Sequence, residues 1–310
     1  MPAIAVALPV TSSHKTIYKS INSIVNQEFK DYEIIIVLNG SDKETANEID
    51  KFKNIKMKVL ELSKPNLSNA LNLAIEKSDS QFIARQDQDD WSYPDRFKKQ
   101  IEYMKEKSQC AVLGSWAYLR AENDEIIRKL KKPVGMKLNK NLLNFQNTII
   151  HSSALIRREA IRKVGAYQIK SIKGFPEDLD LWLRISEIYD IGNYPGYLHN
   201  YYASKNGISR VQDEDFRRNT EIILRERYIR KFNVEEPKEG ILLFKLITWN
   251  FDMLKNESNE WSIITVIRST KILAKTLKLS IISSQSLIII LTFLYQYFKI
   301  KIFSYQKKDG

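Results

Sequence analysis

Short apolar runs alternate with amphipathic stretches along the first hundred positions. Four runs predict strands, at residues 4–8, 33–38, 57–60 and 81–85. Between them, apolar residues recur every three or four positions, as in helices with one buried face, over residues 17–25, 43–52 and 67–77. We expect Thr11, Ser12 and Ser13 to cap the first of these helices. This alternation predicts an α/β fold, with a mainly parallel sheet covered by helices on both faces.

The pattern becomes mixed after residue 100. Strands are predicted at residues 111–120 and 149–156, and helices from about Arg158 and from the segment at 175–178. From residue 212 to 310 the chain reads as helical throughout.

Polar or turn-forming residues follow three of the four predicted parallel strands. Pro9-Val10 follows the first, Asn39-Gly40-Ser41 the second and Asp87-Gln88-Asp89-Asp90 the fourth. Ligands of such sheets bind at the carboxyl ends of the strands, so these segments are expected to form one site. Asn-Gly is also an ordinary turn pair, which leaves plain turn chemistry as the alternative for the second segment.

The Asp87–Asp90 segment carries three carboxylates in four residues, and their mutual repulsion has an electrostatic cost. A divalent cation relieves such repulsion, and Mg²⁺ or Mn²⁺ prefers oxygen ligands completed by water or substrate phosphates. The alternative is an acidic loop that caps the helix expected near Pro94. The position directly after an apolar parallel strand favours the cation site.

Glu177 and Asp178 stand together at the start of a predicted helix. Acidic residues there stabilise the helix dipole by a few tenths of a kcal/mol up to about 1 kcal/mol, which is a purely structural explanation. The functional interpretation is a general base that takes a proton from an acceptor hydroxyl.

In order and spacing these segments match one family. The matching pieces are Leu8-Pro9-Val10, residues 21–27, residues 33–37 with Asn39 to Asp42, residues 69–72, residues 83–90 with Pro94, Arg96 and Gln100, residues 151–153, residues 164–167 and residues 177–182. The chain resembles the inverting family 2 glycosyltransferases of the GT-A fold over residues 3 to 211. The Gln-x-x-Arg-Trp signature of processive synthases is missing, so one sugar per acceptor encounter is expected.

The resemblance implies a role for each matching residue. On the donor side it places Pro9, Val10, Asn39, Arg85 and Asp87 around the nucleotide. It implies Asp89, with Asp87, as the Mn²⁺ or Mg²⁺ ligands, and Asp178, with Glu177 beside it, as the catalytic base. It puts His151 and Trp182 on the acceptor side. Where the family has Tyr-Arg-x-His, this chain has Tyr202-Ala203-Ser204-Lys205, and Lys205 is expected to replace a cationic group near the diphosphate. His151 is equally well read as a structural histidine, and Arg85 as the ion-pair partner of an aspartate.

The domain organisation follows from this resemblance. We expect a GT-A domain over residues 1–211, with a nucleotide-binding half (1–100) and an acceptor half (101–211). We expect residues 212–310 to form a helical, basic C-terminal region that associates with the membrane. Family habits and this basic region predict a UDP-sugar donor and a saccharide or lipid-linked saccharide acceptor in bacterial cell-surface polysaccharide synthesis.

The net charge of +12 is concentrated near the end of the chain, where residues 238–310 carry 11 basic and 5 acidic side chains. Residues 279–298 lack charges and are flanked by lysines, which predicts either association with an anionic membrane surface or a packed amphipathic helix. No zinc-ligand spacing or RNA-binding aromatic motif occurs, so nucleic acid is not an expected partner. The single cysteine, Cys110, lies in an apolar run and allows no intramolecular disulfide, which fits the reducing cytoplasm. With the basic C-terminal region, this predicts a cytoplasmic protein that is peripheral on the inner membrane face.

Other functional classes fit less well. A dinucleotide-dependent dehydrogenase needs a Gly-x-Gly-x-x-Gly turn after the first strand, and a nucleotidyltransferase needs a Gly-rich basic loop there. This chain has Pro9-Val10-Thr11-Ser12-Ser13 instead. A non-catalytic nucleotide-binding or membrane-adaptor protein remains the alternative, although it has no need for Asp87, Asp89 and Asp178 together.

Overall fold

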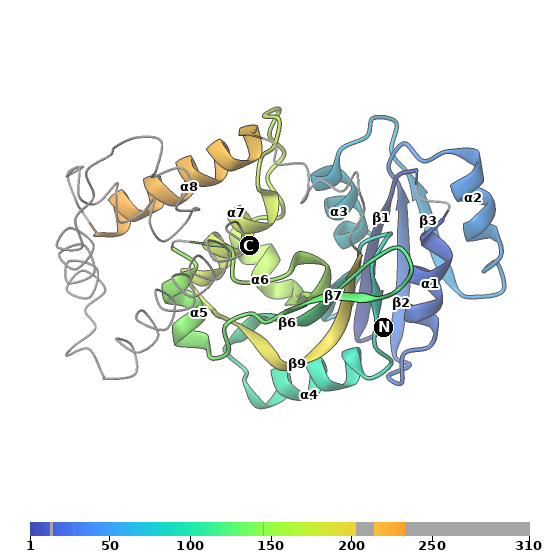
Figure 1. Ribbon diagram of the computed structural model, residues 1–310, viewed down its shortest axis with the longest axis horizontal. Helices are drawn as coiled ribbons and strands as arrows, with labels where there is room; N and C mark the ends of the chain where they lie inside the picture. The colour runs from blue at the N-terminus through green and yellow to red at the C-terminus, as the bar shows by residue number, and fades with distance from the viewer. Residues whose placement is uncertain (13–14, 145, 203–213, 233–310) are drawn as a thin grey trace, which may run out of the picture. The chain divides into compact units, whose positions relative to one another are not determined.

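The computed structural model describes residues 1–12, 15–144, 146–202 and 214–232 (Figure 1). Residues Met1–Arg227 form one compact unit. Its strands are β1 (Ile4–Val10), β2 (Tyr32–Leu38), β3 (Met57–Glu61), β4 (Phe82–Arg85), β5 (Trp91–Ser92), β6 (Cys110–Arg120), β7 (Ile126–Leu130), β8 (Leu155–Arg157) and β9 (Asp190–Tyr202). The helices are α1 (Ile17–Val25), α2 (Lys43–Asp50), α3 (Leu67–Glu76), α4 (Arg96–Glu106), α5 (Met136–Leu142), α6 (Arg158–Val164), α7 (Glu177–Ser186) and α8 (Glu214–Phe232).

One sheet runs through the compact unit in the order β3-β2-β1-β4-β8-β6-β9-β5, with β7 paired to β6. Strands β3, β2, β1 and β4 are parallel neighbours, which confirms the parallel sheet predicted for the first hundred residues. The strand predicted to end before Pro9 continues to Val10, because Pro9 lies opposite Val37 and Val10 opposite Leu38 in the ladder.

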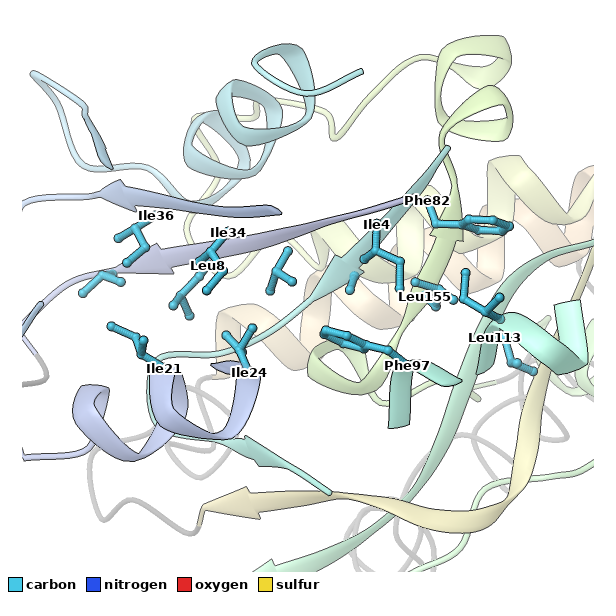
Figure 2. Close-up of a cluster of buried hydrophobic side chains, with 14 of the residues drawn as sticks. Ile4, Leu8, Ile21, Ile24, Ile34, Ile36, Phe82, Phe97, Leu113 and Leu155 are labelled. Carbon is cyan, nitrogen blue, oxygen red and sulfur yellow. The ribbon is translucent and has the colours of Figure 1, made fainter. Parts of the chain in front are cut away.

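Alternate residues of the parallel strands bury one face of the sheet against α1 and α4. Ile4 and Leu8 of β1 lie in the same cluster as Ile21 and Ile24 of α1 and Phe97 of α4 (Figure 2). Each such side chain contributes about 1.5–3 kcal/mol on burial. Helix α3 packs on β1 and β2 through its own buried side chains and so covers this part of the sheet.

The second half of the sheet is mixed. Strand β8 is antiparallel to both β4 and β6, whereas β9 is parallel to β6 along most of its length. The strand predicted at residues 149–156 is largely wrong. His151–Ser153 form a 3₁₀ turn and the strand begins only at Leu155, because the Ser153 hydroxyl and N–H both bond to the Ile150 carbonyl.

The side-chain caps of α2 and α3 come from aspartate and asparagine, and the predicted hydroxyl residues do not cap α1. Helix α1 begins at Ile17 with Thr16 at its N-cap position, so residues 11–13 lie too far upstream to cap it. In α2 the Thr45 N–H donates to Asp42, and in α3 the Asn69 N–H donates to Asn66, each a side-chain cap.

The first part of α8, up to Arg227, belongs to the compact unit, and Arg227 is 4% exposed there. Its guanidinium donates to the Leu183 carbonyl, the Ser186 hydroxyl and the Asn144 side chain, and pairs with Glu187. None of the described helices is long and apolar enough to cross a membrane. Lys205 and residues 279–298 lie outside the described residues, and the division of the chain at residue 211 stays a prediction.

Candidate functional site

The ends of β1 and β2 form one wall of the site. The Asn39 N–H donates to the Val10 carbonyl at 2.7 Å, and the Asn39 side-chain oxygen accepts from the Asn66 N–H at 2.6 Å. The Asn39 NH₂ group makes no hydrogen bond to the described residues. Pro9 and Val10 are buried in the strand, so their side chains support this wall from inside the sheet.

Arg85 ends β4 and is almost completely buried, with 1% of its surface exposed. It donates to the Gln86 carbonyl and, at 2.5 Å, to Asp87, while its Nε has no hydrogen-bond partner among the described residues. Burial opposes the charged form, but Asp87, Tyr167 and Glu177 outweigh it and raise the pKa of Arg85. The side chain is therefore a fixed cation at the carboxyl end of β4.

Asp87 and Asp89 leave the end of β4 on a loop that is tied to its neighbours. The Ser20 hydroxyl of α1 donates to the Asp87 carbonyl at 2.8 Å. Gln88 bridges to Thr11, accepting from its N–H and donating to its hydroxyl at 2.8 Å. Burial, followed by the charges of Asp90 and Asp87, raises the pKa of Asp89 to about 8.

Asp90 belongs to a different, buried network. Its Oδ2 accepts from the Ser152 hydroxyl and lies 3.1 Å from His199 Nε2, and its Oδ1 accepts from the Tyr202 N–H at 2.8 Å. Burial and the charge of Asp87 raise the pKa of Asp90 to about 8. With three partners already in place, Asp90 anchors the loop to β9 rather than facing a ligand.

Arg96, at the start of α4, holds the acidic loop from behind. Its guanidinium donates to the Gln86 side chain, the Ser92 hydroxyl and the Arg85 carbonyl, and also to the Gln100 side chain and the Ala154 carbonyl. Burial lowers its pKa to about 9, opposed by Asp90, so it remains a cation at neutral pH.

Replacing Arg96 by lysine should lower the free energy of unfolding by about 2 kcal/mol. The ammonium group cannot reach all five acceptors of the planar fork, and each buried acceptor left unpaired costs about 1–3 kcal/mol. Chemical denaturation of Arg96→Lys measures the effect. The matched control is Lys98→Arg, two residues along the same helix, where the side chain is 55% exposed and a change below about 0.5 kcal/mol is expected. Equal midpoints for both variants would contradict the anchoring role.

Glu177 and Asp178 form the first turn of α7. Asp178 Oδ2 accepts from Asn147 Nδ2 at 2.6 Å, and Oδ1 accepts from the Leu179 N–H at 2.7 Å. Burial is the main cause that raises the pKa of Asp178. Burial and the charge of Asp178 raise the pKa of Glu177 to about 8, so both groups have an increased affinity for protons.

His151 lies beside this acidic pair. Its Nε2 is 2.9 Å from the Tyr167 hydroxyl and its Nδ1 is 3.9 Å from Glu177. Burial and Arg85 hold the pKa of His151 well below its ordinary value, so the imidazole is neutral. Trp182 is completely buried and packs edge-on against His151 at 5.8 Å between ring centroids.

The donor-side and base-side clusters act on one another electrostatically. Arg85 and Asp87 both change the pKa of Glu177, in opposite directions, and Asp87 and Asp178 both raise that of Tyr167. The charged groups after β4 and at the start of α7 are therefore close enough to affect one another's protonation.

The carboxylates suit a cation that shares its ligands with a phosphorylated substrate. No group of three or more His, Cys, Asp or Glu side chains in the described part of the chain is arranged to hold a metal ion. Mg²⁺ and Mn²⁺ need only one or two carboxylates when phosphate oxygens and water complete the shell. The high proton affinity of Asp89 beside two other aspartates is the chemistry that a cation would relieve.

Several motif residues build the site without facing it. Gln27 donates to the Tyr93 carbonyl and accepts from the Phe97 N–H, which fixes the start of α4. Asn72 of α3 exchanges two hydrogen bonds with the backbone of Tyr167, at 2.8 and 2.9 Å. These amides position the loops, which explains their place in the motif pattern.

Sequence reasoning did not find Lys132 or Asn147. Both lie in irregular segments with no apolar period, and their neighbours in the sequence give no motif. Their only signal is spatial, through the contacts with Asp178 and with each other.

The fold is the GT-A fold, as comparison with solved structures shows. S. aureus TarS 1-349 in complex with UDP-GlcNAc superposes with a TM-score of 0.60 at 16% identity, over 88% of this chain and 81% of that chain. Mannosyltransferase PcManGT from Pyrobaculum calidifontis, in complex with GDP-Man and Mn²⁺, gives a TM-score of 0.55 at 13% identity, over 95% and 80% of the two chains.

The chain belongs to glycosyl transferase family 2, whose family model matches residues 5–165. It is 38% identical to the O-antigen biosynthesis glycosyltransferase WbnJ of Escherichia coli over 186 residues, which are 59% of this chain and 71% of WbnJ. It is 24% identical to the amylovoran biosynthesis glycosyltransferase AmsE of Erwinia amylovora over 214 residues, or 68% and 79% of the two chains. The protein is therefore a glycosyltransferase.

Proposed function

We propose that this glycosyltransferase moves a single sugar from a nucleotide-sugar donor to an acceptor hydroxyl, with inversion at the anomeric carbon. A UDP-sugar is the expected donor and a saccharide or lipid-linked saccharide the expected acceptor, in bacterial cell-surface polysaccharide synthesis. The names of WbnJ and AmsE support the pathway, and the UDP-GlcNAc bound to TarS supports the donor class.

One observation carries this proposal. The carboxylates after β4 and those at the start of α7 meet at the turn His151–Ser153, where the Ser152 hydroxyl donates to Asp90 and the adjacent His151 Nδ1 lies 3.9 Å from Glu177. A site with a diphosphate-binding end and a proton-accepting end is what a one-step glycosyl transfer requires.

Asp178 is the proposed catalytic base. The acceptor oxygen bonds to the anomeric carbon while the bond from that carbon to the donor phosphate breaks, and the hydroxyl proton passes to Asp178. Holding both substrates in line removes much of the entropic part of the barrier. The pKa of Asp178, raised chiefly by burial, makes its carboxylate a stronger proton acceptor than an exposed aspartate.

The donor end is assigned to the β1, β2 and β4 edge. Asn39 is proposed to contact the nucleobase of the donor through its NH₂ group, beside Pro9 and Val10. Arg85 is the proposed positive charge for the nucleotide diphosphate, beside Asp87.

Asp89 and Asp87 would hold Mn²⁺ or Mg²⁺, which when bound supplies positive charge against the developing charge of the leaving diphosphate. His151 is proposed to border the acceptor, with Trp182 supporting its ring from the core. Lys205 stays a proposed phosphate contact.

A donor panel tests the proposal. Purified protein is incubated with UDP-, GDP- and dTDP-sugars with Mn²⁺, Mg²⁺ or chelator, and nucleoside diphosphate release is followed. Cation-dependent turnover of one donor is expected, and it should be absent in Asp89→Ala and retained in Lys98→Arg. No turnover and no cation-dependent nucleotide binding across the panel would favour a non-catalytic adaptor instead.

Residues 212–310 are proposed as a basic region that brings the enzyme to the inner membrane face. The full chain should float with vesicles rich in anionic lipid, less so as salt rises, because a surface charge attraction is screened. A 1–232 truncation compared with the full chain measures this. Equal flotation of both proteins would show that residues 233–310 contribute nothing to membrane binding.

A further inference from the structure

Asp178 is held by a neighbouring asparagine whose orientation is fixed. Asn147 Nδ2 donates to Asp178 at 2.6 Å, while Asn147 Oδ1 accepts from the Ile149 N–H at 3.2 Å. Because an N–H donor occupies the oxygen end of the amide, the NH₂ end must face Asp178. The Asp178 oxygen that faces Asn147 is therefore held as an acceptor.

A partly buried lysine contacts the backbone of this asparagine. Lys132 Nζ donates to the Asn147 carbonyl at 3.0 Å, and the Lys132 carbonyl accepts from Trp116 Nε1 at 2.8 Å. Burial lowers the pKa of Lys132, and the negative charge of Asp178 opposes this shift. Withdrawing an ammonium group even partly from water is costly, so a compensating interaction is expected.

Two buried asparagines hold the lysine and asparagine segments together. Asn193 of β9 is completely buried, and its Nδ2 lies 3.0 Å from the Pro133 carbonyl and 3.0 Å from the Thr148 carbonyl. Asn139 of α5 also donates to the Pro133 carbonyl, at 2.8 Å. The residues that follow Lys132 and Asn147 are thus tied to one strand of the central sheet.

This arrangement needs a glycine on the neighbouring strand. A Cβ atom at Gly114 of β6 would lie 2.4 Å from the Asn193 side-chain oxygen and 3.0 Å from Ile149. The close approach of β6 to Asn193 therefore depends on glycine.

We propose that Lys132 and Asn147 are positioning residues for Asp178, holding its side chain as an oriented carboxylate that is ready to accept the acceptor proton. The inference rests on the proposed function, in which Asp178 is the base. Neither residue is expected to touch the substrate. Asn147 acts on Asp178 through its hydrogen bond, and Lys132 acts on Asp178 through its positive charge.

The charges around Asp178 show the direction of this action. Burial raises the pKa of Asp178, whereas the hydrogen bonds from the Leu179 N–H and Asn147 and the charge of Lys132 lower it. Glu177 on the same helix and Tyr167 from the preceding loop also face it, and Arg85 acts on both of these groups. Removing the charge of Lys132 must therefore favour the protonated form of Asp178.

Three variants separate charge from packing. Lys132→Met removes the charge and the N–H donor, Lys132→Gln removes the charge but keeps an N–H donor, and Lys132→Arg keeps the charge. The acidic limb of the kcat/KM profile against pH should move up by about one unit in Lys132→Met and Lys132→Gln. It should stay within about 0.3 unit of the wild type in Lys132→Arg. Asn147→Ala should move it in the same upward direction.

Donor affinity and thermal unfolding are measured on the same proteins. An unchanged donor Kd with a shifted acidic limb supports the positioning role, since a purely structural residue would not move the limb. If Lys132→Gln and Asn147→Ala are folded and their acidic limb does not move, the positioning role is overturned. If Lys132→Met does not fold, Lys132→Gln replaces it in the test. If Asp178→Asn retains wild-type transfer, the proposed function has failed. If it abolishes transfer while the limb stays unmoved in the other variants, only the positioning role has failed.

Discussion

Asp178→Asn should lower the rate of sugar transfer about a thousandfold at neutral pH, because general base catalysis contributes on the order of 10²- to 10⁴-fold. The amide has nearly the shape of the carboxylate but cannot accept the acceptor proton. Donor affinity should change little, since the donor end lies with Asn39, Arg85 and the acidic loop. The measurement is the rate of product formation at saturating donor, with donor Kd from a separate titration.

The matched control for this prediction is Glu177→Gln, one residue earlier in the same helical turn. Glu177 accepts no hydrogen bond from Asn147 and lies 3.9 Å from His151, so its loss should cost less than the loss of Asp178. The decisive comparison is the order of the two variants. A nearly active Asp178→Asn beside an inactive Glu177→Gln would transfer the role of base to Glu177.

The backbone around Asp178 makes the amide variant informative in a second way. Both carboxylate oxygens accept from N–H donors, Asn147 on one side and Leu179 on the other. An amide must turn its NH₂ group toward one of these donors, so a modest loss of stability is expected. Chemical denaturation in parallel with the rate assay separates this loss from the catalytic effect.

The parallel half of the fold could be predicted because its signals are local. Strands β1, β2 and β4 are short, largely apolar runs, and α1 and α3 show the helical period, so the order of elements follows from the pattern. The acidic loop after β4 could be placed for the same reason, because its function depends on following a parallel strand.

Strand β9 could not be predicted, because it does not look like a strand in isolation. It contains Pro195 and Gly196, and its partner strand β6 has register shifts at Ser115 and Trp116. Its stability comes from pairing with β6 over a long stretch and from buried polar side chains such as Asn193 and His199. Such tertiary support leaves no period in the sequence.

The support behind the site escaped prediction for the same physical reason. Lys132 and Asn147 are 15 positions apart in irregular chain and meet only because Asn193, about 45 positions further on, binds both segments. Motifs in the sequence predict the acidic loop and the start of α7 as segments of the site. They carry no information on residues whose partners are backbone carbonyls, because any residue supplies a carbonyl.

Asp89→Asn should abolish the dependence of donor binding on Mn²⁺ or Mg²⁺, with a fall in transfer of about a hundredfold or more. An amide oxygen is a weaker cation ligand than a carboxylate, and the remaining carboxylate, Asp87, is already paired with Arg85 at 2.5 Å. Donor affinity titrated with and without cation measures the effect. In the variant the two affinities should coincide, whereas in the wild type the cation should tighten binding.

The same variant should gain stability when no cation is present. The pKa of Asp89 is raised to about 8 in the folded protein, so folding is opposed when this group must be charged. The free energy of unfolding of the wild type should therefore fall as pH rises from about 4 toward 8, and Asp89→Asn should show a smaller fall. A functional carboxylate is thus expected to weaken the fold that carries it.

Asp90→Asn is the sharpest control, because the neighbouring carboxylate has the opposite role. Asp90 accepts from Ser152 and the Tyr202 N–H inside the protein, so its replacement should cost about 1–3 kcal/mol of stability. Donor binding by the folded fraction of Asp90→Asn should still depend on Mn²⁺ or Mg²⁺. If Asp90→Asn lost the cation effect and Asp89→Asn kept it, the cation would have to be assigned to the buried network. If neither variant changed it, the acidic loop would serve only to shape the turn after β4.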